Sequence, residues 1–279
     1  MPRLIIGTNW FLGCSHTSKA RDRHIVETVD EARMADIIDV FMRAGADALY
    51  GVHPHGVSLE NAIRTAEDRT GRGCIRIAIP IINVADGPEA LSETARILDD
   101  YAACGTQLLM PHQASTDALV DRRTRRITNM DTYVKMIRER GMLPGLSTHM
   151  PETIPYADES GLDIATYIQI YNSAGFLMQV EVDWVQRIIW EARKPVITIK
   201  PMAAGRLHPL AGLAFAWATL REQDMITVGT LTADEAAEVV EYSFALLEKR
   251  KPDMDLQRTR SKQSLDGKEA VVAADSGAK

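Results

Sequence analysis

Short apolar runs alternate with helical stretches about every 30 residues along the whole chain. The runs have the length and composition of buried strands. They begin at Leu4 (LIIGTN), Ala46 (ADALYG), Ile75 (IRIAIPII), Thr106 (TQLLMP), Leu143 (LPGLST), Ala165 (ATYIQIYN), Pro195 (PVITIKP) and Met225 (MITVGT). Between them, residues 34–42 repeat apolar side chains at i, i+3, i+4, i+7 and i+8, which predicts one face of a helix that Gly45 then ends.

Strands that alternate with helices predict a parallel sheet, and eight such units are the number in a (β/α)8 barrel. The sequence therefore predicts an α/β fold, a single (β/α)8 TIM barrel, over residues 1–256. From Gln257 onward the chain becomes polar and loses its periodicity. Residues 257–279 are therefore predicted to be a polar C-terminal tail, either mobile or packed on a neighbouring molecule.

The composition narrows the class of protein. Of the 279 residues, 46% are hydrophobic and 25% are charged, which is ordinary for a soluble globular protein. The net charge of −6 disfavours nucleic acid as a partner. No apolar run reaches the roughly 18 residues that would span a bilayer, and the first residues are too soon interrupted for a secretory signal. We therefore expect a cytoplasmic protein with a small-molecule substrate and no membrane partner; the helices and tail allow a homo-oligomer without requiring one.

Four histidines each follow an apolar run: His53, His55, His112 and His149. If the runs are strands, all four lie at the carboxyl edge of the barrel, where sites are built. The HPH sequence at residues 53–55 places two imidazoles two residues apart, and an extended backbone would direct both to one side. We therefore predict that some of these histidines share a divalent ion such as zinc, manganese or iron. The alternative is that they are loop residues that only form hydrogen bonds.

Lys200 ends the seventh run, in VITIKPMAAG. A charged side chain at this edge could bind an anionic substrate, act as a base or form a Schiff base. The alternative is a lysine that extends to solvent and pairs with a carboxylate. Arg206, shortly after the same run, is predicted to bind a phosphate or carboxylate, because loops after the last strands of such barrels often do so.

Polar residues at other strand ends are candidates for binding a sugar hydroxyl or a nicotinamide amide. They are Asn9, Gln169, Tyr171 and Asn172. Amides and phenols can donate and accept hydrogen bonds to such groups. The alternative is internal hydrogen bonding between strands and loops.

Two segments of the second half resemble the aldo-keto reductases. Residues 145–172 (GLSTHMPETIPYADESGLDIATYIQIYN) resemble the fifth and sixth units of that family, and residues 194–220 (KPVITIKPMAAGRLHPLAGLAFAWATL) with 226–241 resemble its seventh and eighth. The resemblance implies a (β/α)8 barrel and NAD(P)H as cofactor. It implies that Ser147 and Gln169 hold the nicotinamide carboxamide, with Thr148 where the family usually has Asn.

The catalytic tetrad of that family, Asp, Tyr, Lys and His, is degenerate in this sequence. His112 matches the family's His. Tyr50 stands where the Asp is expected, His55 stands where the Tyr is expected, and the third run has no Lys at its end. The resemblance therefore implies a divergent member that lacks the Lys needed to lower the pKa of a reductase's proton donor.

These observations favour a barrel enzyme that performs non-redox chemistry on a small hydroxy or oxo compound, carbohydrate-like or carboxylated. A divalent metal would polarise a carbonyl or activate water, and His and Lys side chains would move protons. Lyase, isomerase and hydrolase activities all remain open. The predicted catalytic residues are Lys200, His112, His55 and Tyr50. The alternatives are a divergent NAD(P)H-dependent reductase, supported by Ser147, Gln169 and Arg206, and a barrel that binds a ligand without catalysis.

Overall fold

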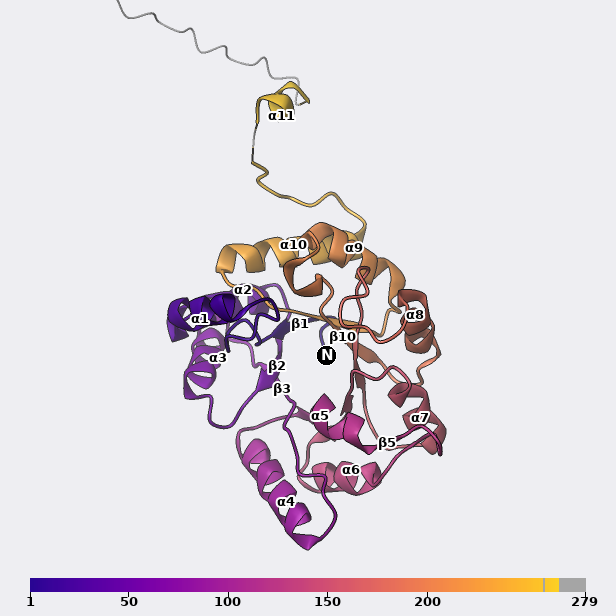
Figure 1. Cartoon of the computed structure of the whole chain (residues 1–279). Coiled ribbons are helices and arrows are strands. Elements are labelled where there is room, and N and C mark those ends of the chain that lie inside the picture. Colours follow the sequence, from indigo (N-terminus) through magenta and orange to yellow (C-terminus); the bar gives the residue numbers. More distant parts are fainter. Residues whose placement is uncertain (258, 266–279) are drawn as a thin grey trace, which may run out of the picture.

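The computed structural model of the protein describes residues 1–257 and 259–265. Within them, parallel strands form a barrel with helices outside it (Figure 1). The barrel strands are β1 (Leu4–Gly7), β2 (Ala48–Val52), β3 (Ile75–Ala78), β4 (Leu108–Leu109), β7 (Leu143–Pro144), β8 (Leu146–Ser147), β9 (Tyr167–Ile170), β10 (Val196–Ile199) and β11 (Met225–Val228). Their order is β7-β4-β3-β2-β1-β11-β10-β9-β8, and every pairing is parallel.

The barrel closes at Gly145. This residue separates β7, which pairs with β4, from β8, which pairs with β9, so the two ends of the strand order are parts of one strand. A Cβ atom on Gly145 would lie 2.7 Å from Cγ of Met110 and 2.9 Å from the carbonyl oxygen of Thr166. Only glycine therefore allows the strands to approach this closely. The single (β/α)8 TIM barrel is confirmed, and each of the eight predicted runs contributes a strand.

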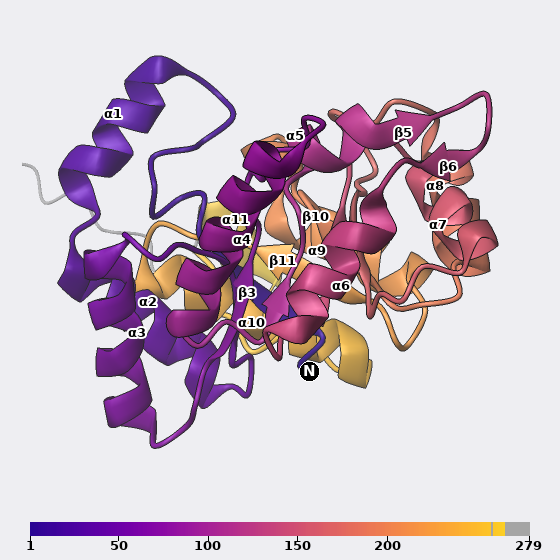
Figure 2. The ribbon, with the colours of Figure 1, turned by 90° about the horizontal axis from the view of Figure 1, so that it is seen from below.

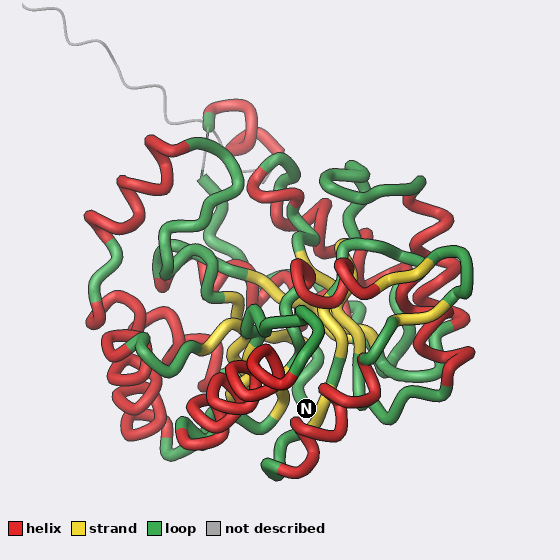
Figure 3. Tube along the Cα trace, turned by 60° about the horizontal axis from the view of Figure 1, so that its bottom comes forward, coloured by secondary structure: helices red, strands yellow, loops and turns green. Residues whose placement is uncertain are grey.

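Helices surround the strands (Figure 3). The longer ones are α1 (Lys19–Thr28), α2 (Glu31–Arg43), α3 (Val57–Thr70), α4 (Pro88–Ala103), α6 (Met130–Glu139), α7 (Thr153–Ser160), α8 (Val182–Glu191), α9 (Pro209–Thr219) and α10 (Ala233–Glu248). The predicted helix at residues 34–42 is α2, which buries that apolar face and ends before Gly45, whose φ is +85°. The helix α1 and the loop before it project beyond α2 and α3 (Figure 2).

Short elements occupy the connections between these helices and strands. They are α5 (Gln113–Thr116), η1 (Asp117–Leu119), the antiparallel pair β5 (Val120–Asp121) and β6 (Arg126–Ile127), η2 (Ala203–Gly205) and α11 (Arg260–Leu265). The helix α11 lies within the predicted tail; residues 258 and 266–279 lie outside the described residues. In the part of the chain that the structure describes, no helix has the length and apolar character needed to cross a membrane.

Alternation along the strands decides which side chains reach the mouth of the barrel. Successive strand residues point to opposite faces. One face forms a small inner cluster of Ile5, Ala48, Tyr50, Ile77, Leu108, Met110, Ile168, Ile170, Ile197, Ile199 and Met225. The other face packs against the helices in a larger cluster. Side chains two residues beyond an inner position, such as His112 after Met110, therefore continue into the mouth.

Candidate functional site

A cavity of about 670 Å³ lies at the carboxyl ends of the strands. It is walled by strand ends and by the loops that follow β1, β10 and β11. The residues in its wall that carry candidate chemistry are Asn9, His16, Tyr50, His112, Ser147, His149 and Lys200. Sequence reasoning singled out all of these except His16.

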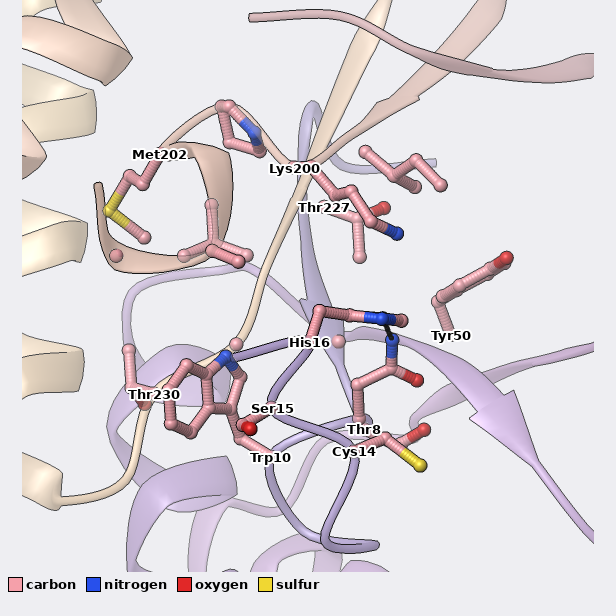
Figure 4. A pocket seen from close by; sticks show the side chains of 18 of the residues that line it. Thr8, Trp10, Cys14, Ser15, His16, Tyr50, Lys200, Met202, Thr227 and Thr230 are labelled. Carbon is pink, nitrogen blue, oxygen red and sulfur yellow. Dashed lines mark hydrogen bonds between the residues drawn. The ribbon is translucent and has the colours of Figure 1, made fainter. Parts of the chain in front are cut away.

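The backbone at Lys200 turns its side chain into this cavity. Ile197 and Ile199 face the inside of the barrel, so continued alternation would direct residue 200 toward the helices. Lys200 instead has a φ of +62°, in the left-handed region that a lysine seldom occupies. Its side chain lines the cavity, near Thr227 (Figure 4). Strain of this kind concentrates at functional sites.

The amine of Lys200 has no partner. Within residues 1–257 and 259–265, no carboxylate lies within 4.0 Å of its Nζ and no acceptor hydrogen-bonds to it. Burial lowers the pKa of Lys200 below its ordinary value of 10.5, because a half-buried ammonium loses hydration that no anion replaces. A lysine in such surroundings is more often a free amine, which is the form that attacks carbonyl carbon.

His112 has one ring nitrogen occupied and one available. Its Nδ1 accepts a hydrogen bond from the backbone N–H of Ala114 at 3.1 Å, at the start of α5. The neutral ring therefore carries its proton on Nε2, which makes His112 a donor to a group in the cavity. Burial lowers the pKa of His112, and the nearby Lys200 lowers it further while Asp117 opposes the shift.

His149 is held at the end of the fifth strand by Asp117. One oxygen of that carboxylate, Oδ2, accepts the backbone N–H of His149 at 3.1 Å, while Oδ1 accepts the hydroxyl of Thr148. Burial lowers the pKa of His149 to about 4, and the charges of Lys200, His112 and His16 act in the same direction. At neutral pH this imidazole is therefore uncharged and can accept a proton.

Tyr50 is 8% exposed and belongs to the inner cluster at the base of the cavity. Burial raises the pKa of its phenol, although a hydrogen bond with Ser147 opposes that shift. The phenol consequently stays protonated and can only donate or accept a hydrogen bond. Its position fits a role in orienting a substrate oxygen better than a role as a base.

His16 is the site residue that the sequence did not reveal. It lies in the loop between β1 and α1, with a φ of +56°, and its Nε2 lies 3.1 Å from Nδ2 of Asn9 (Figure 4). Burial lowers the pKa of His16, with a further contribution from Lys200 and an opposing one from Asp22. The available signal was indirect: the loop between β1 and α1 begins at the same edge of the barrel as every other strand end.

His53 and His55 lie outside the cavity, which corrects the expectation that four histidines converge. Both are exposed; their ring centroids are 5.4 Å apart, and Nδ1 of His53 accepts the N–H of His55 at 3.1 Å. The cause is local: β2 pairs with β3 through a register shift between Tyr50 and Val52, and Gly51 has a φ of +100°. The alternation is broken there, so the HPH segment turns away.

Three of the predicted binding residues also lie outside the cavity wall. The hydroxyl of Tyr171 is 3.0 Å from Oγ1 of Thr219 in the layer between β9 and α9. Asn172 accepts the N–H of Phe176 at 2.8 Å and donates to the carbonyl of the same residue, which closes a loop. Arg206 is exposed and stacks on the ring of Phe176 at 3.9 Å. The structure therefore places these three side chains outside the cavity, and their part in binding a ligand stays a prediction.

The residues that the aldo-keto reductase resemblance assigns to a nicotinamide are separated as well. Ser147 lines the cavity. Thr148 is fully buried and bound to Asp117, and it accepts the N–H of Met150 at 2.9 Å. Gln169 shares the outward face of β9 with Tyr167, and its Oε1 has no partner among the described residues. The three side chains therefore do not form one carboxamide site, and these residues do not fit the cofactor as a set.

Metal-ligating side chains are likewise dispersed. Among residues 1–257 and 259–265, no group of three or more His, Cys, Asp or Glu side chains is arranged to hold a metal ion. His112 and His149 share the cavity, without His53 and His55. The predicted four-histidine set does not fit one ion, and metal binding stays a prediction.

No family model matches the sequence, and no curated protein matches it significantly. Solved structures resemble it. A protein assigned as an aldo-keto reductase from Pseudomonas aeruginosa superposes with a TM-score of 0.61 at 17% identity, over 88% of this chain and 91% of that one. Aldose reductase from Giardia lamblia gives 0.51 at 13% identity (94% and 90%), and a truncated 3-deoxy-D-arabino-heptulosonate 7-phosphate synthase from Thermotoga maritima gives 0.51 at 12% (88% and 86%). These likenesses show a fold shared with aldo-keto reductases and with enzymes of other classes.

Proposed function

We propose that the protein is a non-redox barrel enzyme that forms a Schiff base between Lys200 and the carbonyl carbon of a small oxo compound. The observation that carries the proposal is the unpaired, half-buried amine of Lys200 in a cavity shared with three imidazoles. Amines activated by burial in this way are the nucleophiles of carbonyl lyases and isomerases. Hydrolase activity is the least favoured of the three predicted classes.

The chain's own residues supply the proton transfers of this scheme. The neutral amine attacks the carbonyl carbon, and a C–N bond forms as the carbonyl π pair moves to oxygen. His112 donates its Nε2 proton to that oxygen, while His149 takes a proton from the nitrogen and returns it to His112, so that both imidazoles are neutral again. When the resulting hydroxyl receives a second proton from solvent and leaves as water, the nitrogen lone pair forms the C=N bond. The protonated imine then withdraws electrons from the adjacent carbon, where a bond to carbon or hydrogen breaks.

The reductase alternative has the fold in its favour and the placement of Thr148, Gln169 and Arg206 against it. The family would supply hydride transfer from a nicotinamide. The residues that would hold its carboxamide lie in separate layers of the barrel and do not fit that cofactor as a set. The divalent metal predicted from the sequence is not needed by the Lys200 scheme.

Borohydride trapping tests the proposal. The wild-type protein is incubated with pyruvate, hydroxyacetone or glyceraldehyde, reduced with sodium borohydride and examined by peptide mass spectrometry. The expected result is a secondary amine on Lys200 with at least one compound, absent in Lys200→Met and retained in Lys249→Met, whose lysine is exposed at the end of α10. Labelling of surface lysines alone, together with tight NADPH binding in a fluorescence titration, would replace the proposal with the reductase.

A further inference from the structure

Five basic side chains line the cavity; Arg21 of α1 lies over the ring of Trp10, and the other four come from four separate strand ends. His16 comes from the loop after β1, His112 from the residues after β4, His149 from the end of β8 and Lys200 from the end of β10. Lys200 interacts electrostatically with each of the three imidazoles, and His149 also interacts with the other two. The four groups therefore surround the same space.

The acids near this cavity are turned elsewhere or lie at its far end. Asp117 directs its two oxygens to the Thr148 hydroxyl and the His149 N–H, and Asp22 accepts from Ser15 at 2.6 and 2.9 Å. Glu235 and Glu238 line the end of the cavity formed by α10, where Glu235 accepts the N–H of Leu231 at 2.7 Å. No ion pair joins any of them to the four bases in the described part of the chain.

We infer that the substrate of this site is a 2-oxo acid, whose carboxylate beside the reacting carbonyl supplies the negative charge that the space around the Lys200 amine lacks. The inference rests on the proposed function and names its substrate class. The three imidazoles lie around the amine of Lys200. A carboxylate that is bonded directly to the carbon attacked by this amine would therefore lie among them. Charge-assisted hydrogen bonds from imidazolium and ammonium groups to a carboxylate are among the stronger polar contacts in proteins.

Proton uptake is a physical consequence of this arrangement. In the free protein, burial lowers the pKa of Lys200, and burial together with the charge of Lys200 lowers the pKa of His16 and of His112. A bound carboxylate replaces that repulsion with attraction and raises these pKa values. Groups that are neutral before binding and protonated afterwards take protons from the solution, so carboxylate binding consumes protons near neutral pH.

Trapping with matched carbonyl compounds tests the substrate class. Pyruvate carries the carboxylate, hydroxyacetone has the same number of carbons without it, and dihydroxyacetone phosphate places its charge further from the carbonyl. The expected result is that borohydride traps pyruvate on Lys200 at least about tenfold faster than either of the others. Equal trapping of pyruvate and hydroxyacetone would overturn the inference while leaving the Schiff-base function standing. Faster trapping of dihydroxyacetone phosphate would overturn it in favour of a phosphate-bearing substrate.

Variants of two histidines locate the effect. His16→Ala is expected to slow the trapping of pyruvate by about tenfold and that of hydroxyacetone much less, because it removes a positive charge near the carboxylate. His24→Ala is the matched control, since His24 is exposed on α1 and does not line the cavity. An equal slowing of trapping for both compounds in His16→Ala would show a general disturbance of the loop. It would contradict the inference that His16 binds the carboxylate.

Calorimetry decides the inference even if no adduct forms. Pyruvate is titrated into the wild-type protein in buffers with different ionisation enthalpies, which gives the number of protons exchanged. If borohydride traps no adduct, the Schiff-base function is refuted, and binding with proton uptake that is weakened in His16→Ala and in Lys200→Met would still support a carboxylate site. No binding of pyruvate at millimolar concentration would refute the carboxylate site itself.

Discussion

The segments that follow β10 and β2 leave the barrel at the same edge and place their basic side chains in opposite directions. After β10, the left-handed backbone at Lys200 turns a single amine into the cavity. After β2, the shifted register and the positive φ of Gly51 turn His53 and His55 out to solvent. The pair of histidines is the more conspicuous feature of the sequence, and the lone lysine is the one in the site. The comparison teaches that the dihedral angles of one residue beyond the strand decide which side chains meet.

The largest expected effect is at Lys200. Lys200→Met keeps the bulk of the stem and removes the amine, so imine trapping should be abolished. The same change should raise the free energy of unfolding by about 1 kcal/mol, because burying the ammonium without a partner costs stability. Trapping by mass spectrometry and chemical denaturation measure the two effects.

Lys249→Met is the control that sharpens this prediction. Lys249 also has a positive φ, +55°, but it is exposed at the end of α10. Its replacement should change neither trapping nor stability beyond about 0.5 kcal/mol. A loss of activity in Lys249→Met, or a fully active Lys200→Met, would break the distinction between a functional lysine and an ordinary one.

The barrel could be predicted because the apolar pattern that identifies each strand lies within a few consecutive residues. All eight runs became strands, and α2 buries the apolar face that its spacing predicts. Face assignment along a regular strand was predictable for the same reason. Tyr171 lies on the outward face of β9 with Tyr167, since Ile168 and Ile170 occupy the inward one. The expectation that it contacts substrate ignored this alternation.

The site was predictable only where the strand geometry continues. His112, Ser147 and His149 follow inward strand positions and reach the cavity. His16 does not follow from any strand register, because its place depends on the path of a loop. The prediction that His55 reaches the cavity is wrong because a bulge interrupts the strand register before it. This bulge depends on the pairing of β2 with β3.

The second prediction concerns His112. His112→Ala removes the proton donor to the carbonyl oxygen, and general acid catalysis of this kind contributes about 10²- to 10⁴-fold to a rate. Imine formation should fall by that order. His208→Ala is the matched control, because His208 accepts the N–H of Leu210 at 3.3 Å as His112 accepts that of Ala114. Both variants lose a helix cap, worth about 0.5–2 kcal/mol, and only His112→Ala should lose the rate.

The third prediction is a pH dependence of stability carried by His149. Its pKa is about 4 in the folded protein and 6.5 ordinarily, so the unfolded chain binds a proton that the folded site resists. Its contribution to stability is complete above pH 6.5 and is lost as the pH falls toward 4. After allowance for partial exposure, the loss is about 1–2 kcal/mol.

His149→Gln should flatten this part of a stability profile measured by denaturant titration. Lys200→Met should narrow the pH range over which stability is lost, since removing the ammonium lets the pKa of His149 rise. An unchanged slope between pH 4 and 6.5 in His149→Gln would show that this imidazole is not buried among the other bases.

The smallest effect is expected at His53 and His55, and it tests both sides of the comparison. Each side chain is exposed and outside the cavity, so His53→Ala and His55→Ala should change the free energy of unfolding by no more than about 0.5 kcal/mol and leave imine trapping at the wild-type rate.

Elemental analysis of the same proteins tests the metal prediction. If the four histidines shared an ion, the wild-type protein would carry a stoichiometric metal that either of these variants, or His112→Ala, would release. Because the broken register after β2 separates the HPH segment from His112 and His149, we expect the metal content to be the same in the wild-type protein and in His53→Ala. A metal lost from His53→Ala and His112→Ala alike would show that the segment after β2 closes over the cavity, and the contrast with β10 would disappear.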